Sequence, residues 1–234
     1  MELAMVCLPF AGGGAGFYRA WRDLPPGSPD LVALQLPGRE ELFLDPPHRD
    51  AAAAARQLGG QAAAALRGYP GYVLFGHSLG AVLAFECARV LTSEYADLPA
   101  PRRLFVSGSP GPWAGRTDRA TGLPDEEFVA RVEQFAGYRH DALDEPELRE
   151  ILLPLLRADV EMHEGYAPRD RTPLDIPITA LRGEKDALVG EDEARQWREA
   201  TTAGFDYVEL PGEHMYLVDS PAPLLEAVGR ALAG

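Results

Sequence analysis

The stretch "YVLFGHSLGAVLAFECARVL" (residues 72–91) decides the fold, because it joins two different hydrophobic patterns through one small turn. "YVLFG" is a short apolar run typical of a buried strand, and "AVLAFECARVL" has the apolar spacing of a helix. Between them, Gly76, Ser78 and Gly80 fit the pattern G-x-S-x-G. On a strand–turn–helix, this pattern lifts a serine oxygen above the edge of a sheet, where it can act as a nucleophile. The alternative is a serine in an ordinary strand–helix turn.

Short apolar runs and helical patterns alternate along most of the chain, which predicts one domain over residues 1–234 with a mostly parallel central sheet and helices on both faces. Asp50 is placed to cap an Ala-rich helix, in which Gly59 and Gly60 form an expected weak point. We expect further strands at 3–10, 31–38, 103–108, 176–183 and 206–212, and helices at 51–67, 191–200 and 222–233.

Residues 109–173 interrupt this alternation with two amphipathic helical stretches, 124–137 and 145–166. Pro154 is expected to kink the second stretch, because proline lacks an amide donor. An insertion of this kind suits a lid that excludes water from an active site. The alternative is additional helical packing that does not move.

A serine nucleophile needs a histidine base and an acid, which follow it in the order Ser…Asp…His in this class of fold. Only His214 lies after the last strand and before the last helix, although a histidine on a surface loop is the alternative. The other histidines precede the serine, share its turn or fall in the insertion: His48, His77, His140 and His163.

The acid is expected after the strand at 176–183, and Asp186 follows that strand by three residues. Asp192 in the next helix is the second candidate, and weaker ones are Asp175 and Asp206. The constellation predicts an α/β-hydrolase fold in which Ser78 attacks an acyl carbonyl, His214 takes its proton and Asp186 orients the imidazole.

Negative charge that develops on the acyl oxygen needs backbone N–H donors. The amide of Leu79 is one candidate, because it begins the helix after the serine. The second is expected from the glycine loop "PFAGGGAG" (9–16), where Ala11 is favoured and Phe10 is the alternative. This loop lacks the spacing of nucleotide-binding loops, so we predict no cofactor. Nothing in the placement of the two cysteines indicates a zinc site, so we predict no metal ion.

The formal net charge of −14 argues against nucleic acid and anionic membranes as partners. No run of about 18 apolar residues is present, which argues against a membrane span. Cys7 and Cys87 both lie in apolar segments and are expected to be buried thiols. We expect a cytoplasmic monomer.

A wider set of motifs resembles the type II thioesterases that accompany polyketide synthases and non-ribosomal peptide synthetases. The motifs "LPGRE" and "LLRAD" have no role in the general hydrolase pattern, so they make the resemblance specific. The full set runs in order along the chain: "LPFAGGGAGFY" (8–18), "LQLPGREE" (34–41), "FGHSLGA" (75–81), "LPLLRADVEMHEGY" (153–166), "LRGEKDALV" (181–189) and "GEHMYL" (212–217).

The resemblance implies an editing enzyme that acts in trans on the phosphopantetheine arm of acyl or peptidyl carrier proteins, where it hydrolyses stalled or wrong acyl groups. It also implies the triad Ser78, Asp186 and His214, and a lid at 109–173 over an acyl chamber. The residues around His214 depart from the family's glycine and aromatics, which bears on the acyl pocket. Alternatives are a product-releasing thioesterase, a general carboxylesterase with the same triad and a non-catalytic binding protein.

Carrier proteins of these synthases are usually acidic, and this chain is acidic too, so the two repel over long range. Docking then needs either a local basic patch or a weak, largely apolar contact. Candidate pairs for such a patch are Arg102 with Arg103 and Arg116 with Arg119, and the alternative is that these are solvated surface charges.

Overall fold

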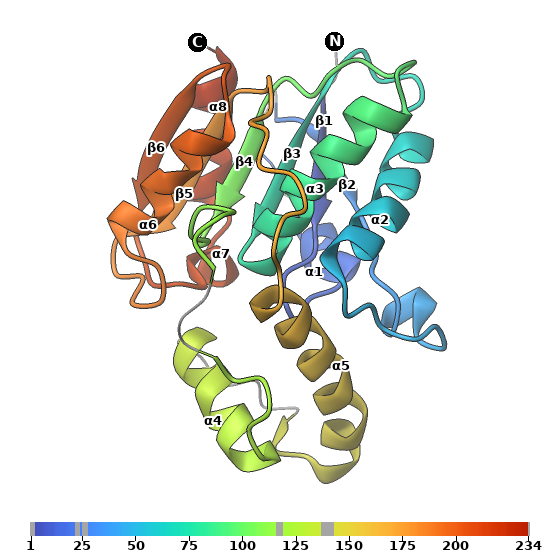
Figure 1. The fold of residues 1–234 in the computed structure, drawn as a ribbon, viewed down its shortest axis with the longest axis vertical. Helices are drawn as coiled ribbons and strands as arrows, with labels where there is room; N and C mark the ends of the chain where they lie inside the picture. The colour runs from blue at the N-terminus through green and yellow to red at the C-terminus, as the bar shows by residue number, and fades with distance from the viewer. Residues whose placement is uncertain (1–2, 22–23, 25–27, 116–118, 137–142, 234) are drawn as a thin grey trace.

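The computed structural model describes residues 3–21, 24, 28–115, 119–136 and 143–233. Among them, six strands form one parallel sheet in the order β2-β1-β3-β4-β5-β6, with helices on both faces (Figure 1), which confirms the predicted architecture. The strands are β1 (Ala4–Leu8), β2 (Asp30–Ala33), β3 (Tyr72–His77), β4 (Leu104–Ser107), β5 (Ile178–Gly183) and β6 (Phe205–Leu210). The helices are α1 (Ala15–Arg19), α2 (Ala51–Ala65), α3 (Leu79–Glu94), α4 (Asp125–Ala136), α5 (Pro146–Glu164), α6 (Glu191–Arg195), α7 (Tyr216–Asp219) and α8 (Ala222–Ala233), with 3-10 turns η1 (Glu40–Leu42) and η3 (Gln196–Ala200).

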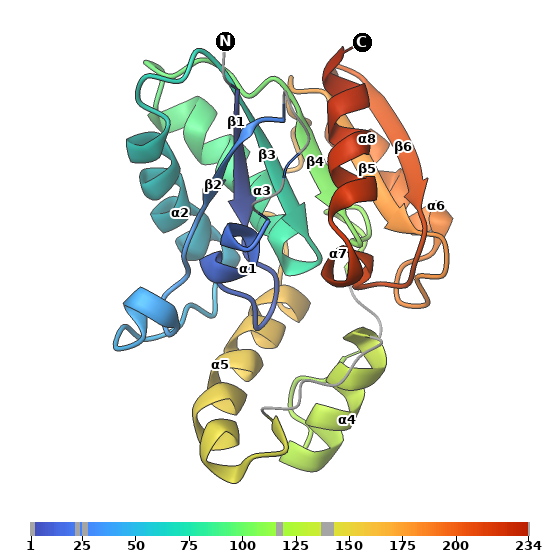
Figure 2. The same cartoon turned by 180° about the vertical axis from the view of Figure 1, so that it is seen from behind.

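The sheet is buried on both faces, as crossover helices require. Helices α2 and α3 cover one face, and α1 and α8 cover the other, which comes to the front in Figure 2. Strand β1 shows the alternation that produces these two cores. Its residues Val6 and Leu8 join the cluster of the α2 and α3 face, whereas Met5 and Cys7 join the cluster of the α1 and α8 face.

Helix α2 runs without a break through Gly59 and Gly60, so the expected weak point does not interrupt it. The Asp50 side chain accepts a hydrogen bond from the Ala53 amide at 2.8 Å and caps the helix, as predicted. A Cβ added at Gly59 would lie 2.6 Å from Cγ1 of Val90 on α3. Tertiary packing between two helices therefore outweighs the low helix propensity of this glycine.

Helices α4 and α5 lie beyond the carboxyl ends of the strands (Figures 1 and 2). They share an apolar cluster of their own: Ala120, Phe128, Val129, Leu143, Leu153 and Val160. Helix α5 is continuous through Pro154, and near its end Met162 joins the main core. The insertion therefore stands over the sheet edge where ligands bind in open α/β folds.

Of the described helices, none combines the length and the apolar character needed to cross a membrane. Cys7 and Cys87 are both buried free thiols, and burial raises the pKa of each.

Candidate active site

Ser78 occupies the turn between β3 and α3 with φ 54° and ψ −118°, in a region that disfavours residues with side chains. The neighbouring glycines make this turn sterically feasible. A Cβ at Gly76 would lie 1.8 Å from the Gly80 carbonyl oxygen, and a Cβ at Gly80 would lie 2.7 Å from the Leu8 carbonyl oxygen. The strained turn leaves the Ser78 side chain at the carboxyl edge of the sheet.

His214 and Asp186 meet at the same edge, on the loops that follow β6 and β5. His214 Nδ1 lies 2.9 Å from Asp186 Oδ2, and both side chains are buried. Asp186 Oδ1 accepts hydrogen bonds from the amides of Leu188 and Val189 at 2.9 and 3.0 Å. Asp186 is therefore fixed by its own loop. It contacts Nδ1 of His214, and the other ring nitrogen, Nε2, does not contact Asp186.

The pKa of Asp186 is lowered despite its buried position. Burial by itself raises the pKa of this carboxyl, but the hydrogen bond and charge of His214 lower it, and so do the two backbone amides. The net direction keeps Asp186 ionised at neutral pH. An ionised carboxylate at this position stabilises an imidazolium on His214.

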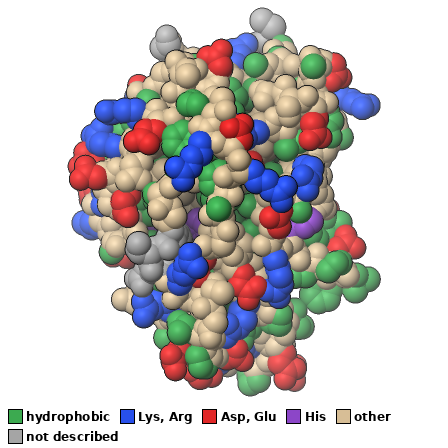
Figure 3. Space-filling view, in the orientation of Figure 1, with side chains coloured by type: hydrophobic (Ala, Val, Ile, Leu, Met, Phe, Trp, Pro, Cys, Tyr) green, Lys and Arg blue, Asp and Glu red, His purple; other side chains and the backbone are tan. Residues whose placement is uncertain are grey.

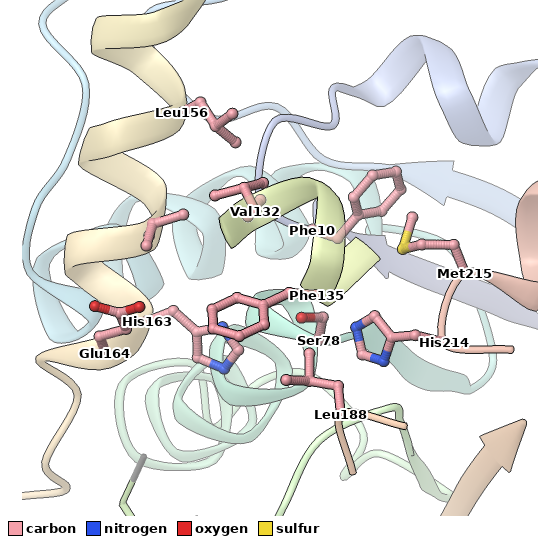
Figure 4. A pocket seen from close by; sticks show the side chains of 12 residues that line it. Phe10, Ser78, Val132, Phe135, Leu156, His163, Glu164, Leu188, His214 and Met215 are labelled. Atoms are coloured by element: carbon pink, nitrogen blue, oxygen red, sulfur yellow. The ribbon is translucent and has the colours of Figure 1, made fainter. Parts of the chain in front are cut away.

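A cavity of about 80 Å³ is lined by both Ser78 and His214 (Figure 4). The imidazole of His214 is turned toward Ser78, although no hydrogen bond joins these two described side chains. Such bonds are often long in unliganded enzymes and tighten when substrate binds. Phe10, Phe135 and Leu188 add apolar walls to this cavity.

The amides predicted as oxyanion donors lie next to Ser78 in the chain or line its cavity. The Leu79 N–H begins α3, so no helical carbonyl can accept its hydrogen bond. Ala11 lines the cavity, and within the described ranges its N–H donates to no other group. The next two amides are occupied, because Gly12 donates to Asp159 and Gly13 donates to the Phe10 carbonyl.

His77, which sequence reasoning set aside, packs against the catalytic candidate His214 with ring centroids 4.9 Å apart. Its Nδ1 lies 2.9 Å from Ser107 Oγ, which is 2.6 Å from the Tyr216 hydroxyl. Burial and the charge of His214 hold the pKa of His77 well below its usual range, so His77 is neutral. A Cβ at Gly108 would lie 2.5 Å from the His77 ring and 3.1 Å from the His214 ring, so that glycine makes room for both.

A second cavity of about 300 Å³ lies between the glycine loop and the insertion. It shares five lining residues with the first: Phe10, Ala11, Val132, Leu156 and Met215. Leucines of the insertion, including Leu152 and Leu155, make its wall mostly apolar. Met215, in the segment that departs from the family pattern, lines both cavities.

The structure places three of the competing site candidates, Asp192, His48 and His163. Asp192 is exposed in the first turn of α6, and His48 bonds to Gln57. His163 lines the cavity of Ser78, and His140 lies outside the described residues. No group of three or more His, Cys, Asp or Glu within the described parts of the chain is arranged to hold a metal ion.

The structure tests one of the two arginine pairs considered for docking, Arg102 with Arg103. Arg102 and Arg103 precede β4, so they lie at the amino end of the strands, opposite Ser78, and Arg103 is paired with Asp206. That position makes them unsuitable for a partner that reaches the active site. Arg116 lies outside the described residues, whereas Arg119 lies in the insertion. Figure 3 shows basic and acidic side chains interspersed over the visible face rather than gathered in a basic patch.

A serine on a strained strand–helix turn, with a His–Asp pair at the carboxyl edge of a parallel sheet, defines an α/β-hydrolase. The family model for the thioesterase domain matches residues 4–232, so the chain belongs to the thioesterase family and is a thioester hydrolase. It is 31% identical to the gramicidin S biosynthesis protein GrsT of Aneurinibacillus migulanus, with 99% of this chain and 89% of that protein covered.

Solved structures agree with this assignment. The RedJ thioesterase from the prodiginine pathway of Streptomyces coelicolor is 32% identical, with a TM-score of 0.87 over 97% of this chain and 89% of that one. The type II thioesterase BorB from the borrelidin biosynthetic cluster is 34% identical, with a TM-score of 0.82 over 98% of this chain and 91% of that one. The predicted resemblance to type II thioesterases is thereby confirmed.

Proposed function

We propose that this thioesterase acts in trans on acyl or peptidyl carrier domains of a polyketide synthase or non-ribosomal peptide synthetase. It hydrolyses aberrant or stalled acyl groups from the phosphopantetheine arm and returns the free thiol to the synthase. The relatives named for gramicidin S, prodiginine and borrelidin biosynthesis support this setting. The enzyme works in the compartment of its synthase, which we propose is the cytoplasm, and as a monomer.

In the proposed mechanism, Ser78 Oγ attacks the thioester carbonyl as His214 Nε2 takes its proton, and Asp186 stabilises the imidazolium. The amides of Leu79 and Ala11 donate hydrogen bonds to the oxygen that becomes negative. Each donor of this type lowers the activation barrier by about 3–4 kcal/mol. Collapse breaks the C–S bond, and the thiol leaves with the proton from His214. A water deprotonated by His214 then hydrolyses the acyl-enzyme and releases the acid.

The observation that carries this proposal is the buried His214–Asp186 pair. His214 lines one cavity together with Ser78, and that cavity adjoins an apolar chamber. Ligand pockets range from about 300 to 1,000 Å³, so a chamber of about 300 Å³ suits a short acyl group. The wall formed by Leu152, Leu155 and Leu156 favours an apolar chain in that chamber.

The face drawn in Figure 3 has no large basic patch among its described residues to receive a carrier domain. We propose a weak contact with an apolar component. Phe43 and Leu44 on the projecting turn at η1 are exposed, Leu44 at 93%, and Figure 3 shows hydrophobic side chains over this part of the molecule. A brief contact suits an editing enzyme, which must leave correctly loaded carriers undisturbed.

The test presents one short acyl group in three forms: on a phosphopantetheinylated carrier domain, on coenzyme A and as a nitrophenyl ester. We expect the highest kcat/KM for the carrier-bound thioester. If the oxygen ester is the best substrate and the carrier adds nothing, the protein is a carboxylesterase. A mixture of two carrier substrates, one loaded with a short acyl group and one with a finished product, separates editing from product release. An editing enzyme hydrolyses the short acyl group faster.

A further inference from the structure

A buried ion pair joins the insertion to the body of the molecule. Arg39, in the motif "LPGRE", donates from Nη1 to Oδ2 and from Nη2 to Oδ1 of Asp159, both at 2.8 Å. Asp159 belongs to the motif "LLRAD" on α5, 120 positions away. The side chains are 6% and 1% exposed, so the pair is removed from solvent.

The same two side chains hold the glycine loop. Asp159 Oδ2 accepts a hydrogen bond from the Gly12 amide at 2.8 Å, and Arg39 Nη1 donates to the Gly13 carbonyl at 2.8 Å. Gly12 has φ +76°, and glycine backbone rotates more freely than that of any other residue. A run of three glycines does not hold one conformation by itself, so these contacts constrain the orientation of its peptide planes.

The far end of the loop is held from the same turn. Glu40 adopts a positive φ of 48°, and its carboxylate accepts from the Gly16 amide at 3.0 and 3.2 Å. Gln35 Oε1 accepts from the Ala15 amide at 2.9 Å. The segment around "LPGRE" therefore contacts the glycine loop at both ends, with Asp159 completing the arrangement from α5.

Stability alone does not account for the pair. Removing two charges from water costs several kcal/mol per ion, and well-packed apolar residues often replace such a pair without loss of stability. The location of the Arg39–Asp159 pair beside the glycine loop explains its presence better than stability does. Asp159 accepts a hydrogen bond from the Gly12 amide and so fixes the peptide next to Ala11. Ala11 lines the cavity of Ser78, and its own N–H donates to no other described group.

We infer that Arg39 and Asp159 are positioning residues for the oxyanion hole, and that they connect its geometry to the placement of α5. This inference rests on the proposed role of the Ala11 amide. The pair touches neither the reacting carbonyl nor Ser78 and acts through the glycine loop alone. Its loss is expected to weaken binding of the transition state and to leave binding of the substrate ground state unchanged.

The test replaces both partners by apolar residues of similar size, Arg39→Met with Asp159→Leu, which avoids leaving one charge buried alone. The readouts are kcat and KM on an acyl thioester, and affinity for a short alkyl trifluoromethyl ketone, which forms a tetrahedral adduct with a serine. The matching methyl ketone reports ground-state binding. Thermal unfolding shows whether the variant is folded, and Asp125→Asn, which breaks the Arg157–Asp125 pair within the insertion, is the matched control.

We expect kcat to fall by about 10- to 100-fold, because a small misplacement of a donor has an effect of this size. Affinity for the trifluoromethyl ketone should fall by the same factor, whereas KM and methyl ketone affinity stay within about twofold and Asp125→Asn resembles the unaltered protein. A folded double variant with unchanged kcat and adduct affinity would overturn the inference. So would losses of methyl ketone and trifluoromethyl ketone affinity in equal measure. Absence of thioester hydrolysis in the unaltered protein would instead count against the proposed function.

An unfolded double variant would be followed by Arg39→Lys, which keeps the charge but removes the bidentate geometry. In Arg39→Lys we again expect kcat and trifluoromethyl ketone affinity to fall while KM stays unchanged, with a smaller loss than in the double variant. A folded Arg39→Lys protein that lost neither would also overturn the inference.

Discussion

Ser78 holds a backbone conformation that a residue with a side chain adopts only under constraint, and the constraint is visible in the glycines around it. The proposed acid and base are each held by a second group. Asp186 is held by the amides of its own loop, and His214 is held by Asp186 and by the His77 ring. Such second contacts keep a catalytic geometry within the narrow limits that it needs.

Replacing Asp186 by Asn keeps the shape of the side chain but removes the charge that stabilises the imidazolium. We expect Asp186→Asn to lower kcat on an acyl thioester by on the order of 10³–10⁴-fold. Asp192→Asn serves as the control, since that carboxyl is exposed in α6 and away from His214. The measurement is the kcat of both variants at steady state. An equal change of kcat in both would contradict the proposed role of Asp186.

His77 makes folding stability depend on pH in a predictable direction. Its folded pKa lies well below the value of 6.5 in the unfolded chain, so the unfolded state binds a proton more readily. Stability therefore falls as pH falls below about 6.5, with a slope approaching 1.4 kcal/mol per pH unit for one proton. His77→Asn should flatten the pH dependence of the unfolding free energy between pH 7 and 5, measured by urea denaturation. Identical slopes in both proteins would contradict a buried neutral His77.

The positions of Ser78, Asp186 and His214 could be predicted because they follow strand ends in an order that the fold imposes. Arg39 and Asp159 could not be placed together from the sequence. They lie 120 positions apart, and nothing in helix or strand periodicity brings two such residues into contact. The signal available was that their motifs have no role in the general hydrolase pattern.

At the scale of the element, the turn from β3 into α3 depends on the absence of a side chain at Gly76. A Cβ there would lie 1.8 Å from a backbone oxygen, which cannot move aside as a flexible side chain does. We expect Gly76→Ala to lower the free energy of unfolding by about 3 kcal/mol or more. Gly229→Ala in α8 is the matched control, because a Cβ there meets nothing within 4 Å and should stabilise the helix by about 0.5–1 kcal/mol. Denaturant unfolding of both variants tests the contrast, and a Gly76→Ala protein as stable as the control would refute it.

Five of the six strands were predicted to within two residues at each end, because each is a short apolar run bounded by turn residues. The strand expected at 31–38 was predicted too long, since β2 ends at Ala33. The helices α1 and α7 were missed, since five and four residues are too short to show helical periodicity. Contacts from outside hold α1, where Gln35 accepts from Ala15 and Glu40 accepts from Gly16. Elements of this kind depend on the tertiary structure rather than on local sequence.

At the scale of the whole molecule, the two helices of the insertion are attached differently. Asp159 and Met162 fix the second half of α5 to the body. Glu164, at the end of α5, accepts hydrogen bonds from the amides of Ala120 and Thr121, which belong to the insertion itself. Helix α4 contributes to the separate apolar cluster of the insertion. We therefore propose that any opening over the active site moves α4 and leaves the second half of α5 in place.

Hydrogen exchange tests this division directly. Amides of α4 (Asp125–Ala136) should exchange faster than those at 156–163 in α5, which should approach the protection of β3. Equal, strand-like protection in both helices would mean that the insertion is fixed packing. Fast exchange throughout both would mean that the Arg39–Asp159 pair does not anchor α5.

The placement of the insertion over the carboxyl edge follows from connectivity, because the chain leaves the sheet at the carboxyl end of β4 and forms the insertion before it enters β5. The surface that would meet the proposed carrier domain could not be predicted from connectivity in this way. Arg102 and Arg103 form a basic pair in the sequence, but they precede β4 and therefore lie at the amino end of the strands. Charge clusters in a sequence say little about docking until the edge that carries them is known.

The most direct test of the central claim is to identify the residue that carries the acyl group during turnover. The protein is mixed with an acyl thioester, quenched in acid within the first turnovers, digested and examined by mass spectrometry, with Ser78→Ala in parallel. We predict one acyl group on the peptide that contains Ser78, none in the variant, and hydrolysis by the variant lower by on the order of 10⁴-fold or more. An acyl group on another residue, or a Ser78→Ala protein that still hydrolyses the thioester, would contradict the mechanism.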